Sequence, residues 1–144
     1  VADRIRGLLF GAAVADACGL ATEFLSHARA EEFYGAGFLY RPGCDPFPDT
    51  HRSFFPPGDW TDDTDQMLLI LQSLLEHSGE ASPTDFAGRL RRWARQGFQE
   101  LGDRCGSGLG KTVGKVVEAA GFEENPSECA ERVWRSNGCN LAAN

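Results

Sequence analysis

The stretch PPGDWTDDTDQMLLILQSLLEH, residues 56–77, leads from a proline-containing loop into an apolar run. Apolar residues in this run recur at helical spacing on one wide face: Met67, Leu68, Ile70, Leu71, Leu74 and Leu75. The stretch therefore predicts a helix over about 62–77 at the centre of the fold. Just before this face, four aspartates fall within seven residues: Asp59, Asp62, Asp63 and Asp65. Such crowding of negative charge needs a physical reason.

Helical signals also dominate the rest of the chain. Ser82-Pro83-Thr84-Asp85 and Asn125-Pro126-Ser127-Glu128 are typical helix starts, with a capping residue followed by proline. Besides the central helix, we expect helices over 3–24, from 83 until a break at 102–110, over 111–120 and over 126–135, with one helical turn at 28–34. No segment has a convincing strand pattern. With 144 residues, the chain is predicted to be a single all-α domain over 1–144, a multi-helix bundle of five or so helices.

Small residues form a stripe along the first predicted helix. They recur every four positions, at Gly7, Gly11, Ala15 and Gly19. A glycine inside a helix costs about 1 kcal/mol relative to alanine, so this thin face has to serve a purpose. Either another helix approaches closely, or a substrate lies against the stripe near Asp16 and Glu23.

Composition excludes several classes of partner. The formal net charge is −7 and the chain has no basic run, which argues against binding to nucleic-acid phosphates or an anionic membrane surface. No apolar segment approaches the roughly 20 residues that a membrane span needs. Five cysteines without a CxxC pair indicate reduced thiols and no structural disulfide, and we expect them to be buried apolar thiols in a cytoplasmic or nuclear protein.

Residues 26–58 are rich in glycine, proline and aromatic residues and lack a regular period, which predicts a long irregular loop. Loops of this length in a compact domain are usually functional or disordered. Its aromatic residues favour a packed loop: Phe33, Tyr34, Phe38, Tyr40, Phe47, Phe54 and Phe55. The three histidines, His27, His51 and His77, have no metal-ligand spacing and are interpreted as solvated or capping residues. Trp93 and Trp134 are expected in the core, and Trp60 against the acidic loop.

The acidic helix start has two explanations. The free amides and the dipole of a helix N-terminus favour negative charge by about 0.3–1 kcal/mol for each residue, which accounts for one or two aspartates. Four exceed that need, because their mutual repulsion grows. A hard divalent cation such as Mg²⁺ would resolve the conflict, since it takes oxygen ligands and keeps several waters. Thr61, Asp62 and Asp63 can present a hydroxyl and two carboxylates to one or two adjacent ions.

Several motifs, in order and spacing, resemble those of the ADP-ribosylglycohydrolase (DraG-like) family. They are Gly7, Gly11, Ala15-Asp16-Ala17, Gly19 and Glu23-Phe24, followed by Trp60-Thr61-Asp62-Asp63-Thr64, then Gly106-Ser107-Gly108-Leu109-Gly110-Lys111-Thr112 and Ser136-Asn137-Gly138. The resemblance covers essentially the whole chain and implies an all-α fold of this type, here about its N-terminal half. It also implies two Mg²⁺ ions, with Mn²⁺ as an alternative, and hydrolysis of the bond between ADP-ribose and a protein side chain or related acceptor.

The same resemblance implies roles for individual residues. Thr61, Asp62 and Asp63 would be metal ligands, and Glu23 would lie beside the metals and the scissile bond. Asp62 or Asp63 would act as the general base, and the sequence does not choose between them. Asp16 is interpreted as a support for the acidic loop. The structural alternative for Glu23 is a solvated charge at a helix end.

The glycine-rich segment has a competing interpretation. GLGKT resembles the end of a nucleotide-binding P-loop, but Cys105 stands where that motif needs glycine and no strand precedes it, so we reject this reading. The residues expected to bind the diphosphate of ADP-ribose are Gly106, Ser107, Gly108 and Gly110. Asn137 and Gly138 would contact the distal part of the ligand. A tight interhelical turn and a helix C-cap are the structural alternatives for the two segments.

The chain also departs from the family pattern. Family members are about twice as long, and their second aspartate-rich metal motif, of the Asp-x-Asp-Thr/Ser type, is absent here. We therefore expect a fragment of a longer enzyme. The alternative function is a non-catalytic relative that binds ADP-ribose or is purely structural, and a haloacid-type phosphatase is a distant third. The expected partner is ADP-ribose or an ADP-ribosylated protein, with nucleic acid only as a modified acceptor.

Overall fold

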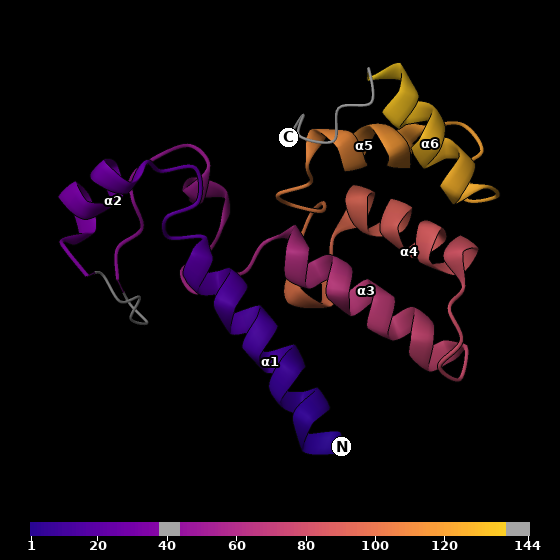
Figure 1. The fold of residues 1–144 in the computed structure, drawn as a ribbon, viewed down its shortest axis with the longest axis horizontal. Coiled ribbons are helices and arrows are strands. Elements are labelled where there is room, and N and C mark those ends of the chain that lie inside the picture. Colours follow the sequence, from indigo (N-terminus) through magenta and orange to yellow (C-terminus); the bar gives the residue numbers. More distant parts are fainter. Residues whose placement is uncertain (38–43, 138–144) are drawn as a thin grey trace. The chain divides into compact units, whose positions relative to one another are not determined.

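The computed structural model describes residues 1–37 and 44–137. The chain divides into two compact units, Val1–Thr64 and Asp65–Asn144, and Figure 1 shows the elements of both. The described residues form six α-helices and two short 3₁₀-helices and contain no strand, which confirms the all-α prediction. Within these residues, no helix is both long and apolar enough to cross a membrane.

The first unit contains α1 (Ala2–Gly19), α2 (His27–Tyr34) and the 3₁₀-helix η1 (Arg52–Phe54). The first helix was predicted to extend to residue 24 but ends at Gly19, and Phe24 has a positive φ of 59°. The carbonyls of Ala21 and Glu23 accept hydrogen bonds from Arg52 instead of continuing the helix. A side chain from the irregular segment therefore ties that segment to the turn after α1.

α1 is unusual for a helix with so many apolar residues, because none of its residues is buried. Leu8 is 69% exposed and Phe10 is 73% exposed. Within its own unit, nothing lies within 4 Å of the Cβ positions that Gly7, Gly11 and Gly19 lack. The first unit thus shows no close helix approach along the small-residue stripe.

The long segment after α1 is partly ordered by aromatic contacts, as predicted. The ring of Phe33 lies edge-on to those of Tyr34 and Phe47, with centroids 4.8 and 5.1 Å away. Phe54, which was also expected to pack, is 71% exposed. The expectations for Phe38 and Tyr40 lie outside the described residues.

The second unit contains most of α3 (Asp62–Glu76) and all of α4 (Pro83–Gln96), η2 (Gln99–Leu101), α5 (Lys111–Glu118) and α6 (Pro126–Ser136). The predicted helix start at residue 82 is confirmed: the Ser82 hydroxyl accepts a hydrogen bond from the Asp85 amide, and Pro83 follows at the first turn. The break after α4 was expected at 102–110 but falls at Gly97, whose φ is +62°. A Cβ there would lie 2.2 Å from that of Asp103, so only glycine fits this turn.

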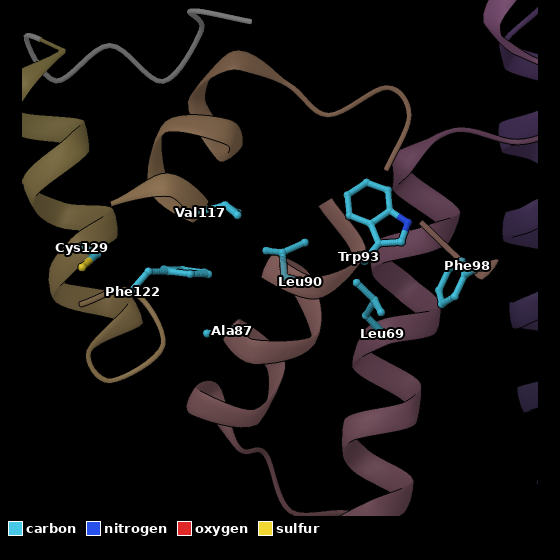
Figure 2. Packing of buried hydrophobic residues seen from close by; sticks show 8 residues of the cluster. All are labelled: Leu69, Ala87, Leu90, Trp93, Phe98, Val117, Phe122 and Cys129. Carbon is cyan, nitrogen blue, oxygen red and sulfur yellow. The ribbon is translucent and has the colours of Figure 1, made fainter. Parts of the chain in front are cut away.

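A hydrophobic core holds α3–α6 together (Figure 2). It contains Leu69, Ala87, Leu90, Trp93, Phe98, Val117, Phe122 and Cys129. Trp93, predicted to be in the core, is only 2% exposed, whereas Trp134 is 36% exposed and was wrongly assigned to it. The cysteines that the structure describes are all free, and Cys105 is exposed rather than buried as expected.

Candidate functional site

A carboxylate from α1 fixes the start of α3. Asp16 Oδ1 accepts a hydrogen bond from the Thr61 hydroxyl at 2.7 Å, and Oδ2 accepts from the Thr64 hydroxyl at 2.6 Å. The backbone amides of Thr61 and Thr64 also donate to Oδ2, at 3.0 and 3.1 Å. Asp16 therefore caps a helix that begins 46 positions later in the chain, and the predicted support of the acidic loop is confirmed.

The four aspartates of the acidic stretch have different partners. Asp59 accepts a hydrogen bond from the Trp60 amide at 2.9 Å. Asp65 is buried and accepts one from the indole N–H of Trp93, also at 2.9 Å. Asp59 and Asp65 thus have structural contacts, and Asp62 and Asp63 are the two carboxylates that the sequence singles out for chemistry.

Asp62 lies where a negative charge is unfavourable. Burial raises its pKa to about 6, and the neighbouring charges of Asp63, Glu23 and Asp16 act in the same direction. Asp63, by contrast, is exposed. Glu23, Asp16, Thr61 and Asp63 line one side of an open hollow of about 340 Å³ in the first unit. The predicted residues Glu23, Thr61 and Asp63 thus line the same hollow. Asp62 lies close enough for the charges of Glu23 and Asp63 to act on its carboxyl.

The donor set around this hollow suits a hard cation. The available groups are carboxylate oxygens and one hydroxyl, the ligands that Mg²⁺ prefers. A positive charge would offset both the burial and the repulsion that raise the pKa of Asp62. The Thr61 hydroxyl already donates its proton to Asp16, so it can offer only a lone pair. Within residues 1–37 and 44–137, no group of three or more His, Cys, Asp or Glu side chains is placed to hold a metal ion. A complete ligand set would therefore need further donors.

Glu23 follows α1 and is held by residues that the sequence did not single out. His51 Nε2 lies 2.7 Å from Glu23 Oε2. Arg52 donates hydrogen bonds to the carbonyls of Ala21 and Glu23, and to Asp49. The interpretation of His51 as merely solvated or capping therefore misses its contact with Glu23.

Arg52 is the most deeply buried charge of this region, with only 2% of its surface exposed. Its partner Asp49 is subject to opposing effects: burial raises the pKa of that carboxyl, but the hydrogen bonds and charge of Arg52 outweigh burial and hold the pKa below its ordinary value. Tyr34 adds a second link, because its hydroxyl donates to the Ala21 carbonyl at 2.9 Å. Nothing in the local sequence marks the contacts to the Ala21 carbonyl, since Tyr34 and Arg52 lie 13 and 31 residues away from it.

The glycine-rich segment lies in the second unit. Gly106 packs against the indole of Trp93, and a Cβ there would lie 2.9 Å from three ring atoms. Gly108 has a φ of +84°, and Gly110 precedes α5 as its N-cap residue. This is the geometry of the tight interhelical turn. The expected contact of Gly106, Ser107, Gly108 and Gly110 with a diphosphate stays a prediction.

Asn137 ends α6, which is the geometry of the helix C-cap. Its Oδ1 accepts a hydrogen bond from Lys115 at 2.9 Å, whereas its Nδ2 is buried and lacks a partner among the described residues. The prediction for Gly138 lies outside those residues. Ligand contact by Asn137 stays a prediction.

Comparison with known proteins gives a consistent result. The profile of the ADP-ribosylglycohydrolase family matches residues 1–143. An uncharacterized protein of Archaeoglobus fulgidus is 36% identical over 91 residues, which are 63% of this chain and 27% of that protein. No solved structure is significantly similar to the chain.

Two bacterial relatives have a named activity. ADP-ribosylarginine hydrolase Tri1 of Serratia proteamaculans is 31% identical over 81% of this chain and 28% of its own length. The protein of the same name from Pseudomonas putida is 33% identical over 72% of this chain and 24% of its own length. The chain thus covers about a quarter of the length of the curated relatives that it matches.

Proposed function

The chain belongs to the ADP-ribosylglycohydrolase family, and on that premise we propose that it forms part of a metal-dependent hydrolase that cleaves the bond between ADP-ribose and a protein side chain or related acceptor. One observation carries the proposal. The charge-crowded pair Asp62 and Asp63 begins a helix that Asp16 fixes, and Glu23 lies beside the same hollow. The burial and neighbouring negative charges that raise the pKa of Asp62 make a bound cation favourable here.

The groups that would hold a cation are Asp62, Asp63 and Thr61, together with donors outside the described residues. When bound, Mg²⁺ or Mn²⁺ would supply positive charge that orients the ribose hydroxyls and makes a water more acidic. Two ions, as the family resemblance implies, are part of the proposal. Without a metal, the carboxylates of Asp62 and Asp63 repel each other. A cation would bind to these two charges without first having to bring them together.

The reaction itself is a displacement by water at the anomeric carbon of the ribose. The water oxygen forms a bond to that carbon while the bond to the acceptor nitrogen breaks. A carboxylate takes the proton that the water loses and passes it to the leaving nitrogen, so the products are ADP-ribose and the free acceptor. Asp62 and Asp63 are the candidate bases, and Glu23 is the carboxylate placed to stabilise positive charge that develops on the ribose.

Arginine is the first acceptor to test. Two relatives carry the name ADP-ribosylarginine hydrolase. A guanidinium group on the acceptor would also complement an acidic site that contains Glu23, Asp62 and Asp63. The diphosphate of ADP-ribose would contact the amides of the segment 106–110. Asn137 and Gly138 would contact the distal part of the ADP-ribose.

A second candidate function is binding of ADP-ribose without turnover. It is favoured by the absence, from the described residues, of three or more metal-ligating side chains in one group. Under this alternative the acidic helix start would still attract a cation weakly, but hydrolysis would not follow.

The test is release of ADP-ribose from an ADP-ribosylated arginine peptide by the whole polypeptide that contains this chain. We expect turnover with Mg²⁺, its loss in EDTA, and a loss of at least about 100-fold in Asp62→Asn and Asp63→Asn. Asp3→Asn is the matched control, because Asp3 is on the exposed surface of α1. Binding of ADP-ribose without any hydrolysis would favour the second candidate. The absence of both binding and hydrolysis would contradict both candidates.

A further inference from the structure

The Glu23 carboxylate, which lines the hollow, is paired with a histidine that is not part of the predicted site. His51 Nε2 and Glu23 Oε2 are 2.7 Å apart, although the two residues are separated by 28 positions in the chain. A carboxylate can only accept a hydrogen bond, so we assign the donor role to His51 Nε2 in this pair. Within the described residues, the Glu23 side chain forms this hydrogen bond through Oε2 and none through Oε1, so Oε1 can interact with a ligand.

The backbone on both sides of this pair is held in place. Arg52, the next residue after His51, donates from Nε to the Ala21 carbonyl at 3.0 Å and from its terminal nitrogen to the Glu23 carbonyl. Its own amide donates to Asp49 Oδ1 at 2.8 Å. Because one buried guanidinium ties the His51 segment to the end of α1, the imidazole reaches Glu23 from a fixed position.

The imidazole ring is also restrained. The Phe24 ring lies edge-on to it with centroids 5.0 Å apart, and the Phe55 ring does the same at 5.6 Å. Phe24 has a φ of 59°, a conformation that is costly for a residue other than glycine. This unusual backbone conformation therefore occurs at the residue whose ring contacts His51, directly after Glu23.

We propose that His51 is a positioning residue for the hydrolysis proposed above: its hydrogen bond fixes the rotamer of the Glu23 carboxylate, so that Oε1 faces the hollow that Asp16, Thr61 and Asp63 line. The proposal rests on the proposed function and adds to it a residue outside the predicted ligand set. A free glutamate at a helix end samples several rotamers, and holding one of them in advance lowers the entropy lost on reaching the transition state.

Two substitutions separate positioning from packing. His51→Gln keeps an N–H donor at about the same distance from the backbone but loses the aromatic ring, whereas His51→Phe keeps the ring and loses the donor. In the whole polypeptide with Mg²⁺, we expect His51→Phe to lower kcat for ADP-ribosylarginine hydrolysis at least about 10-fold with KM within about 3-fold. His51→Gln should stay within about 3-fold of the wild type. His27→Phe is the control, because His27 is 93% exposed and 3.8 Å from Glu31.

A second readout does not depend on turnover. The chain has three histidines, so the ¹⁵N NMR signals of their rings can be assigned by substitution. Glu23→Gln should shift the Nε2 resonance of His51 and leave those of His27 and His77 unchanged. An unchanged His51 resonance would overturn the pair itself.

The possible results distinguish the two proposals. A hydrolase in which His51→Phe retains full kcat, or in which His51→Gln is impaired as severely as His51→Phe, overturns the positioning role and leaves the proposed function intact. A wild-type polypeptide that hydrolyses no ADP-ribosylated acceptor overturns the proposed function, and with it the role of His51 in that reaction. Loss in His51→Phe, retention in His51→Gln and the shifted resonance together support the proposal.

Discussion

Different forces stabilise the inside of each of the two units. In the second unit, α4 buries Ala87, Leu90 and Trp93 in an apolar core (Figure 2). In the first unit, α1 buries none of its residues, although it is long and rich in apolar side chains. Around the end of α1, polar groups hold the backbone of the first unit in place instead, chiefly the carboxylate of Asp16 and the guanidinium of Arg52.

This difference explains where a site can arise. A packed core needs apolar groups in a fixed geometry and leaves no room for a ligand. A network of directed hydrogen bonds fixes polar side chains just as well but leaves some of their oxygens facing solvent. The candidate carboxylates, Glu23, Asp62 and Asp63, accordingly lie in the unit that hydrogen bonds organise.

Removal of a core side chain should have the largest effect and should be confined to the second unit. Trp93→Ala removes a buried indole and its hydrogen bond to the buried Asp65 carboxylate, so we expect a loss of about 3–5 kcal/mol in the free energy of unfolding. Urea denaturation measures it. Trp134→Ala, at a half-exposed position, should lose far less, and equal losses would contradict the assignment of the core to Trp93.

The corresponding change in the first unit removes the polar anchor. Asp16→Ala breaks four hydrogen bonds to the start of α3, and we expect a loss of about 2–3 kcal/mol. Amide hydrogen exchange should show faster exchange at Thr61 and Thr64. Asp3→Ala on the same helix is the control, since Asp3 is exposed, and unchanged exchange at both threonines in Asp16→Ala would refute the anchor.

Two glycines should respond in opposite directions. Gly106→Ala forces a methyl group against the indole of Trp93 and should cost about 1–3 kcal/mol. Gly7→Ala in α1 meets nothing within 4 Å in its own unit and should stabilise the helix by up to about 1 kcal/mol. Thermal unfolding of both variants tests this. A destabilising Gly7→Ala would show that another segment covers the small-residue stripe.

The smallest expected effect is the pH dependence of the free energy of unfolding that Asp85 in the second unit contributes. The hydrogen bond from Arg89, followed by one from Ser73, holds the pKa of Asp85 below its ordinary value, and burial opposes them only in part. Because the folded-state pKa is lowered, this contribution is present above the ordinary value of about 3.8 and is lost as pH falls through the folded-state pKa.

The wild-type free energy of unfolding should fall as the pH is lowered, and in Asp85→Asn this fall should be smaller by about 0.5–1 kcal/mol. Unfolding curves collected between pH 6 and pH 2 give the difference. The exposed pair of Asp3 and Arg6 in the first unit provides the comparison, and Asp3→Asn should leave the curve unchanged. An Asp85→Asn curve parallel to the wild-type one would rule out this contribution.

The sequence was most informative where local rules decide the structure. Helix starts such as Ser82-Pro83 were predicted because the cap and the proline act on their own turn. The end of α1 was not predicted, because Arg52 reaches it across 31 positions, and no periodicity encodes such a contact. Trp134 was misplaced because an apolar residue at helical spacing need not face a partner.

The candidate site was predicted in part for the same reason. The motif around Asp62 and Asp63 is local and therefore visible in the sequence, whereas the separate uses of Asp59 and Asp65 depend on the fold. His51 was missed because its contact with Glu23 joins a helix end to an irregular segment. Asp16 was interpreted correctly as a support for the acidic loop, but its four hydrogen bonds to Thr61 and Thr64 at the start of α3 were not predicted.

The central claim is that Asp62 and Asp63 present paired charge for a cation that in turn binds an ADP-ribosyl group. The most direct measurement is a calorimetric titration of ADP-ribose into the whole polypeptide that contains this chain, with Mg²⁺ and again after EDTA. We predict binding heat with Mg²⁺ that disappears in EDTA and in the double variant Asp62→Asn/Asp63→Asn. Equal heat in all three experiments, or none with Mg²⁺, would contradict the claim.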